Sequence, residues 1–405
     1  MPVTPFRILD TRSGSPYQRG AGALGAGATR TLQISGVTGL PIGTDPIPAT
    51  ATAVSINVTA VAGTATSLLT VYPNGTGRPN ASNLNFTAGA VTPNLVTVVL
   101  GESGAVNIFN AVGTVNVVAD VEGYFEPQSS SDVTGQYHPM APVRVCDTRT
   151  TRYACGARGA LVGAVPRLVN VTGAGAGDIP TSGVQAAVLN LTGVAGTAAT
   201  YLSVYPPTSA GACTSPGIST LNLAAGHVQA NRVMVALGPA TTGAADTSVC
   251  VYSAAGAINV VLDAGGWFAD SSGPPGDQYQ PIGPSRICDT RSGSGQPCAG
   301  HPIAARGIQT VQVASKGGVP ATGEGTPPLA VIANVTAIAP PAPTYVTVYP
   351  ASETTTPGVS DINMQAGAVL GNLAAVELGT GSGAIDVFSA ASAVNVVIDV
   401  EGWFQ

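Results

Sequence analysis

The sequence predicts an all-β protein made of three tandem, homologous antiparallel β-sandwich domains, of jelly-roll or immunoglobulin-like type. Three observations predict it: one set of motifs occurs three times along the 405 residues, each copy holds about eight short runs of β-branched and apolar residues, and turn-forming residues separate the runs. No segment shows the capped 3.6-residue period of a helix. The strand topology stays open at this point.

The repeat begins with RILDTR at residues 7–12, which returns as RVCDTR at 144–149 and RICDTR at 286–291, about 140 residues apart each time. The same landmarks follow in the same order in every copy: an NVT or NLT strand, VYP, the SNLN, STLN or SDIN run, and NVVADVEGYF or its equivalent. We therefore expect domains at 1–127, 142–270 and 284–405, joined by Ser-, Pro- and Gly-rich connectors at 128–141 and 271–283.

In the first copy, each expected strand is a cluster of Val, Ile, Leu, Thr or aromatic residues between Gly, Pro, Asn or Ser. The first carries the RILDT motif, the fourth ends at a Tyr-Pro pair, and the last is apolar on both faces. In chain order the expected strands are 6–11, 29–35, 52–61, 67–73, 83–87, 94–100, 105–110 and 115–125.

Composition excludes several classes of function. The net charge is −6, only 9% of residues are charged, and there is a single lysine and no basic run, so we expect no nucleic-acid partner and no basic membrane patch. No window approaches the roughly 18 apolar residues of a membrane-spanning helix, so no membrane insertion is expected. The 44% apolar content is enough for folded domains.

The six cysteines predict disulfides. Two pairs lie at equivalent places around the DTR motif, the first copy lacks both members, and the remaining pair occurs only in the second copy. The predicted bridges are Cys146–Cys155, Cys288–Cys298 and Cys213–Cys250. A zinc site is the rival interpretation, but there is no C-x-x-C spacing and the three histidines occupy non-equivalent positions. Disulfides imply an oxidising, extracellular setting.

The recurring charges predict an ion-pair cluster. Asp120 lies in the expected last strand, and a buried carboxylate needs a cationic partner. We expect Arg7 or Arg12 to pair with Asp120 while Asp10 caps the turn through its own backbone, so that the first strand is held to the last. The clusters of the three copies are Arg7, Asp10, Arg12 and Asp120; Arg144, Asp147, Arg149 and Asp263; and Arg286, Asp289, Arg291 and Asp399.

An alternative is that the Arg-Asp cluster is an exposed site for a sugar. Tyr72, Tyr205 and Tyr349 precede a proline, and they either form the rim of a glycan site or simply end a strand. Two sets of recurring asparagines lie within strand-like runs, where ladder or turn hydrogen bonds are expected. These are Asn57, Asn190 and Asn334, which also match weak glycosylation sequons, and Asn85, Asn222 and Asn363.

No catalytic or cofactor-binding constellation is visible. No histidine recurs, no G-x-S-x-G is present, and Ser103 in GESG has no recurring histidine partner. The recurring aspartates lie near an arginine or inside an apolar strand, which favours structural roles, and no D-x-D-x-D cluster suggests calcium. We therefore expect no enzyme activity, no cofactor and no metal.

The combination of R-x-x-DTR, NVT, VYP, S-x-L-N and NVV-x-D-x-x-G-[YW]-F resembles a repeat of exported actinobacterial proteins, in three tandem copies covering nearly the whole chain. The resemblance implies an all-β accessory unit outside the cell, attached to envelope polymers, with no catalytic residues to carry over. The chain departs from the appended form of that repeat because it holds no enzyme domain and no segment that reads as a signal peptide.

Two functions follow as expectations. The first is a non-catalytic extracellular surface protein that binds a cell-wall polymer or glycan through three similar modules. The second is a structural protein, associated with other subunits of a surface fibre or of an actinobacteriophage virion as a decoration, fibre or tail component. In either case the expected location is the cell surface or the virion surface.

Overall fold

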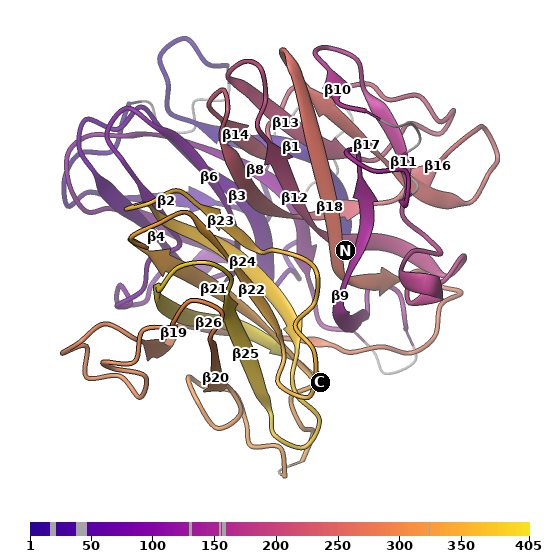
Figure 1. Ribbon diagram of the computed structural model, residues 1–405. Helices are drawn as coiled ribbons and strands as arrows, with labels where there is room; N and C mark the ends of the chain where they lie inside the picture. The colour runs from indigo at the N-terminus through magenta and orange to yellow at the C-terminus, as the bar shows by residue number, and fades with distance from the viewer. Residues whose placement is uncertain (17–21, 38–46, 129–131, 154, 156–158, 324) are drawn as a thin grey trace.

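The computed structural model describes residues 1–16, 22–37, 47–128, 132–153, 155, 159–323 and 325–405. Within these residues the chain is built from antiparallel strands, and the helical segments are two short 3₁₀ turns, Glu102–Gly104 and Gly175–Gly177. Figure 1 shows the strands of the three repeats gathered into one body, from indigo through magenta to yellow.

Each repeat supplies a similar series of strands. Repeat 1 contains β1 (Pro2–Asp10), β2 (Thr29–Gln33), β3 (Ala53–Val61), β4 (Ser67–Pro73), β5 (Leu84–Phe86), β6 (Val91–Val99), β7 (Ala105–Asn110) and β8 (Asn116–Phe125). Repeat 2 contains β9 (Tyr137–Asp147), β10 (Leu161–Val162), β11 (Arg167–Asn170), β12 (Val184–Val194), β13 (Thr200–Tyr205), β14 (Leu221–Leu223), β15 (Val228–Ala236), β16 (Gly238–Pro239), β17 (Asp246–Ser253) and β18 (Ala257–Ala269). Repeat 3 contains β19 (Tyr279–Asp289), β20 (Ile308–Gln312), β21 (Ala330–Ile338), β22 (Thr344–Pro350), β23 (Ile362–Met364), β24 (Val369–Glu377), β25 (Ala384–Ser389) and β26 (Asn395–Phe404).

The strands form six sheets, two from each repeat. In repeat 1 the order is β1-β8-β3-β6 in one sheet and β2-β7-β4-β5 in the other. Repeat 3 has the same orders, β19-β26-β21-β24 and β20-β25-β22-β23. In repeat 2, β9 and β10 both pair with β18, and β16 adds to β17. We call the sheet that contains the first and last long strands of a repeat its inner sheet, and the other its outer sheet.

Each repeat has its own apolar core between its two sheets, and a fourth core lies where the three inner sheets meet. In repeat 1, Ile56 and Val58 of the inner sheet belong to the same core as Leu69 and Val71 of the outer sheet. The central core takes residues from all three repeats. It contains Ala53, Leu95, Phe125, Tyr137, Ala186, Val188, Met234, Phe268, Ala330, Ile332, Leu373, Ala375 and Phe404.

The inner sheets are buried on both faces, which explains their composition. Along β3 the alternating residues Val54, Ile56 and Val58 face the core of repeat 1, whereas Ala53 faces the central core. Eight of the nine residues of β3 are buried, and β21 shows the same burial pattern. A sheet with one face in water would alternate apolar and polar residues instead.

The prediction of three tandem β-sandwich domains is therefore wrong. The outer sheet of each repeat reaches the inner sheet of another, because β14 contacts β6, β23 contacts β15 and β5 contacts β24. The six sheets thus follow one another in a closed ring, as the blades of a six-bladed β-propeller do. The sequence argument failed because it assigned all apolar residues of a copy to that copy's own core, although inner-sheet residues such as Ala53, Val188 and Ile332 pack in a central core shared with the other repeats.

All eight strands expected in repeat 1 are present as β1 to β8. The domain bounds stay a prediction, but β9 begins at Tyr137 and β19 at Tyr279, so the ends of both expected connectors are strand. These tyrosines reach into the centre, where the Tyr137 hydroxyl donates to the Gly265 carbonyl over 2.9 Å and the Tyr279 hydroxyl to the Glu401 carbonyl over 3.0 Å.

The closed ring of sheets predicts that truncating an aromatic residue of the central core will strongly lower the stability of the protein. The ring centroid of Phe125 lies 4.2 Å from that of Tyr279 and 6.2 Å from that of Phe268, so its side chain contacts both other repeats. We expect Phe125→Ala to lower the free energy of unfolding by about 3–5 kcal/mol in chemical denaturation. The control Phe109→Ala, on an outer sheet, should cost about 1 kcal/mol or less. Equal losses would contradict the central core.

Candidate functional site: the charge clusters and the junctions between repeats

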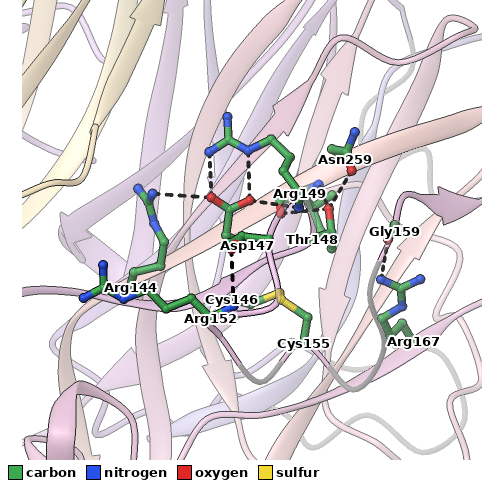
Figure 2. Close-up of a disulfide and its surroundings, with 12 residues drawn as sticks. Arg144, Cys146, Asp147, Thr148, Arg149, Arg152, Cys155, Gly159, Arg167 and Asn259 are labelled. Carbon is green, nitrogen blue, oxygen red and sulfur yellow. Dashed lines mark hydrogen bonds and ion pairs between the residues drawn. A yellow bond between two sulfur atoms is a disulfide. The ribbon is translucent and has the colours of Figure 1, made fainter.

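The DTR motif forms a compact charge cluster, which Figure 2 shows for repeat 2. Asp147 accepts three hydrogen bonds from Arg149: from the backbone N–H over 3.0 Å, from Nε over 2.8 Å and from Nη2 over 2.7 Å. The carboxylate therefore caps the turn and holds the guanidinium of the residue two positions later. About half of the Arg149 side chain stays exposed.

The first arginine of the motif reaches the last strand. Arg144 of β9 donates to Asp263 of β18 through Nε over 2.8 Å and Nη2 over 3.2 Å, and it lies 3.6 Å from Asp147. Arg144 and Asp263 are also backbone partners in the sheet. The same geometry recurs in the other repeats, with Arg7 on Asp120 and Arg286 on Asp399, each over 2.8 Å. The structure thus brings together all twelve residues of the predicted clusters.

The threonine between the two charged residues completes the motif. Thr148 Oγ1 donates to Asn259 Oδ1 over 3.0 Å and accepts a hydrogen bond from the backbone N–H of Val260 over 3.0 Å. Equivalent bonds join Thr11 to Asn116 and Thr290 to Asn395. Thr148 and Arg144 therefore attach the first strand of the repeat to its last, while Asp147 and Arg149 hold the turn that follows the first strand.

The two carboxylates of a cluster differ in their environments. Hydrogen bonds from Arg149 lower the pKa of Asp147, although partial burial opposes them. Burial raises the pKa of Asp263 to about 6, even though hydrogen bonds from Arg144 act to lower it. Because Asp263 is nearly inaccessible and both of its oxygens are engaged by Arg144, the pair is an internal contact of the sheet rather than an open ligand site.

All three predicted disulfides are formed. Cys146–Cys155 and Cys288–Cys298 tie the loop after each DTR motif to its strand, and Figure 2 shows the first of them beside the charge cluster. Cys213–Cys250 attaches the long loop after β13 to β17. Together they leave no free cysteine in the described part of the chain.

The three tyrosines expected at a ligand rim are buried instead. Tyr72 is 5% exposed, Tyr205 is 2% exposed and Tyr349 is 1% exposed. Each lies near the end of an outer-sheet strand, ahead of the loop that leads to the next strand. The rim interpretation is therefore wrong, and the alternative that these residues end a strand describes their position.

The polar contacts that recur at all three junctions between repeats come from asparagines. Asn57 donates to the Ser219 carbonyl over 2.7 Å, Asn190 to the Ser360 carbonyl over 2.6 Å and Asn334 to the Ser82 carbonyl over 2.6 Å. The direction is repeat 1 to 2, 2 to 3 and 3 to 1, so the bonds close a cycle.

A second set of asparagines points the opposite way around the ring. Asn231 donates to Asn57 Oδ1 over 2.9 Å, Asn372 to Asn190 Oδ1 over 2.8 Å and Asn94 to Asn334 Oδ1 over 2.8 Å. Sequence reasoning expected Asn57 and its equivalents to bond within a ladder or turn, so it missed the junctions. The available signal was an asparagine recurring in a strand that is otherwise apolar on both faces.

The junction between repeats 2 and 3 differs from the other two. Arg232 of β15 donates to a carboxylate oxygen of Asp361 and to the Leu373 carbonyl, over 3.0 Å for the latter. The equivalent strand positions hold Leu95 and Leu373, and nothing in the motif set indicated this ion pair. Gly265 lies beside this guanidinium: a Cβ there would be 3.2 Å from the Ala375 carbonyl oxygen and 3.4 Å from Arg232 Nη1.

The other two repeats carry a buried glutamate at the position of Gly265. Glu122 accepts a hydrogen bond from the backbone N–H of Met234 over 2.9 Å, and Glu401 accepts one from that of Thr97 over 3.1 Å. Both bonds cross a junction. Burial raises the pKa of each carboxyl to about 8.

Within the described ranges, no group of three or more His, Cys, Asp or Glu residues could hold a metal ion. The same part of the chain contains no helix with the length and apolarity needed to cross a membrane.

No protein-family model matches the chain, and no curated protein matches its sequence. Two solved virus structures resemble it weakly. A chain from a structure titled "The Triple Jelly Roll Fold and Turret Assembly in an Archaeal Virus" is 10% identical, with 99% of this chain and 95% of that chain covered and a TM-score of 0.18. A chain from "Life in the extremes: atomic structure of Sulfolobus Turreted Icosahedral Virus" is 9% identical, with 99% and 89% covered and a TM-score of 0.19. TM-scores this low do not establish a shared fold or function.

The charge cluster predicts unequal effects of its two arginines. Arg286→Ala removes the cation from Asp399, which is 1% exposed, and should lower the free energy of unfolding by about 3–5 kcal/mol. The control Arg291→Ala removes a side chain that is 49% exposed, and it leaves the buried Asp289 with the backbone N–H of residue 291 and with Arg286 at 3.7 Å, so the cost should be smaller, about 1–2 kcal/mol. Chemical denaturation of both variants measures the difference, and small, equal losses would favour an exposed ligand site over a structural clasp.

The buried glutamates predict a pH dependence of stability. Their pKa is about 8 in the folded chain against an ordinary value of 4.5, so the folded state binds their protons more tightly. The stability they contribute is complete below pH 4.5 and is lost as pH rises through about 8. We expect Tm to fall over this range by at least about 2 °C, as measured by circular dichroism.

The matched control replaces both glutamates, as Glu122→Gln with Glu401→Gln. In this variant, Tm should fall less between pH 4.5 and 8 than in the wild type. Asp263, with a pKa of about 6, contributes part of the fall in Tm that remains, in the same direction. An unchanged decline in the double variant would rule out these carboxyls as its source.

Proposed function

We propose that this chain is a non-catalytic extracellular surface protein that attaches to a cell-envelope polymer or glycan through its three similar units. The observation that carries the proposal is the closed ring. The inner sheets pack on one another and each outer sheet lies on the far side of its own core, with β5, β14 or β23 against another repeat and alternate residues of β2 and β20 exposed to solvent, so the exposed parts of the outer sheets are held in a fixed arrangement.

Fixed, repeated faces suit a repetitive ligand. A polymer offers the same group many times, so a second unit binds to a chain that the first has already brought close. A rigid arrangement also avoids the entropy cost of ordering flexible modules on binding. The resemblance of the motif set to repeats of exported envelope proteins supports the same ligand class.

The extracellular location rests on the three disulfides, since such bonds persist in oxidising compartments. A non-catalytic role is supported by the state of the recurring charges. In each cluster both carboxylates are engaged by arginine side chains of the same repeat, which suits structural ion pairs better than groups that exchange protons with a substrate.

A second candidate function is a structural protein of a surface fibre or of a virion, as a decoration, fibre or tail component. The specific observation in its favour is the cyclic pattern of asparagine bonds from repeat 1 to 2, 2 to 3 and 3 to 1. A single chain with this pattern has the form of a trimer and could occupy a threefold position in a symmetric assembly.

A sedimentation assay with purified actinobacterial cell walls separates the two functions. We expect the folded protein to sediment with the walls and the heat-unfolded chain, as control, to bind no more than an unrelated protein of similar net charge. A folded protein that stays in the supernatant would contradict attachment. Ordered oligomers in negative-stain images of the protein alone would favour the structural role.

A further inference from the structure

The outward faces of two outer sheets each carry a pair of aromatic rings. On β13, Leu202 and Val204 face the core of repeat 2, so the alternate residue Tyr201 faces outward. Its ring centroid lies 6.1 Å from that of Tyr252 on β17. In repeat 3 the equivalent pair is Tyr345 and Phe388, with centroids 6.3 Å apart.

An asparagine lies directly across from one ring of each pair. Tyr201 is the register partner of Asn222 on β14, and Tyr345 is the partner of Asn363 on β23. Each amide is held in place by its own turn, because Asn222 Nδ2 donates to Ser219 Oγ over 3.0 Å and Asn363 Nδ2 to Ser360 Oγ over 3.1 Å. Cross-strand neighbours are about 5 Å apart at Cβ, so ring and amide can contact one ligand together.

The electrostatic character of these faces selects the class of ligand. Around the ring pair of repeat 2, the neighbouring side chains on the same face are Ser203, which is buried and donates a hydrogen bond to the Ile218 carbonyl, and the half-buried Asn222, and both are uncharged. In repeat 3, Tyr345 is 38% exposed and the neighbouring Ile308 is 53% exposed. The charges beside the two platforms already have partners: Arg7, near Tyr201, is paired with Asp120, and Asp386, near Phe388, accepts a hydrogen bond from Thr310 over 2.6 Å. An apolar platform whose neighbouring charges are paired complements a neutral ligand, because a charged one would lose hydration without a free counter-charge.

Repeat 1 provides an internal contrast. It has Leu68 at the position of Tyr201 and Tyr345, and its remaining ring, Phe109, is covered by its own chain. The guanidinium carbon of Arg78 lies 4.2 Å from the centroid of Phe109, in cation–π contact. The corresponding loops of repeats 2 and 3, residues 206–220 and 351–361, contain no arginine.

We propose that the aromatic pairs Tyr201/Tyr252 and Tyr345/Phe388 are two binding sites for pyranose rings of a neutral polysaccharide, and that repeat 1 lacks such a site. The inference rests on the proposed function, names its ligand and limits the pyranose sites to two of the three units. The C–H groups on one face of a pyranose pack against an aromatic ring, while the adjacent asparagine amide bonds a ring hydroxyl. Two sites on a rigid body then bind neighbouring stretches of one polymer.

The test is affinity electrophoresis in native gels that contain arabinogalactan, mannan or β-glucan. We expect at least one of these glycans to slow the wild-type protein. Tyr201→Ala with Tyr252→Ala, or Tyr345→Ala with Phe388→Ala, should weaken retardation by at least about tenfold. The variant that carries all four substitutions should abolish it. The control Phe109→Ala should leave it unchanged. Circular dichroism of each variant verifies folding.

Three outcomes overturn the inference, two from the retardation and one from self-association. Retardation that survives in the folded fourfold variant would place glycan binding elsewhere on the molecule. Absence of retardation by all three glycans would exclude neutral polysaccharides. In either case, continued sedimentation with purified cell walls would leave the proposed attachment function standing, so the two failures are distinguishable. If the substitutions change self-association rather than retardation, the faces contact a second copy of the chain and the proposal is wrong.

Discussion

The architecture depends on one constraint: the asparagine side chains of Asn57, Asn190 and Asn334, buried on the inner sheets, need hydrogen-bond partners, and they find them in another repeat. Asn57 is 1% exposed and sits in a strand that is almost wholly buried. An amide in that position without a partner would cost a few kcal/mol, which is a large part of the stability of a whole domain. The Ser219 carbonyl supplies the partner, and the two equivalent bonds do the same at the other junctions. A repeat separated from the others would expose this polar row together with its share of the central core.

The charge clusters act at a different level. Each ties the first strand of one repeat to the last strand of the same repeat, so it stabilises the inner sheet on which the junctions are built. The sequence has few charged residues, 9% in all, and it concentrates them in these clusters, which contain six of the 14 aspartates. Closing an inner sheet within its own repeat fixes the position of its asparagines, and the asparagines then fix the repeats relative to one another. The aromatic pairs of the outer sheets belong neither to the charge clusters nor to the asparagine junctions. A ligand can therefore bind to them without disturbing the closed ring of six sheets.

The sequence allowed the strands, the disulfides and the membership of the charge clusters to be predicted, because each of these is a local pattern or a pairing that recurs in register. Asp120 in an apolar strand required a cation, and the same copy offered Arg7 and Arg12, of which the structure uses Arg7. The closed ring of sheets could not be predicted in this way. A strand that is buried on both faces has the same apolar sequence whether the sheet packed on its second face belongs to its own repeat or to another. Asn57 was therefore assigned to a ladder. The tyrosines before proline were misjudged because nothing in the sequence shows that the following loop covers them, and Arg232 occurs in one copy only, outside any repeated motif.

Differential scanning calorimetry of the intact chain tests the central claim most directly. If the buried polar junctions and the central core unite the three repeats, the protein unfolds in one transition whose calorimetric and van't Hoff enthalpies agree for all 405 residues. Three separable transitions, each with the enthalpy of about 130 residues, would show that the repeats are independent and would contradict the account.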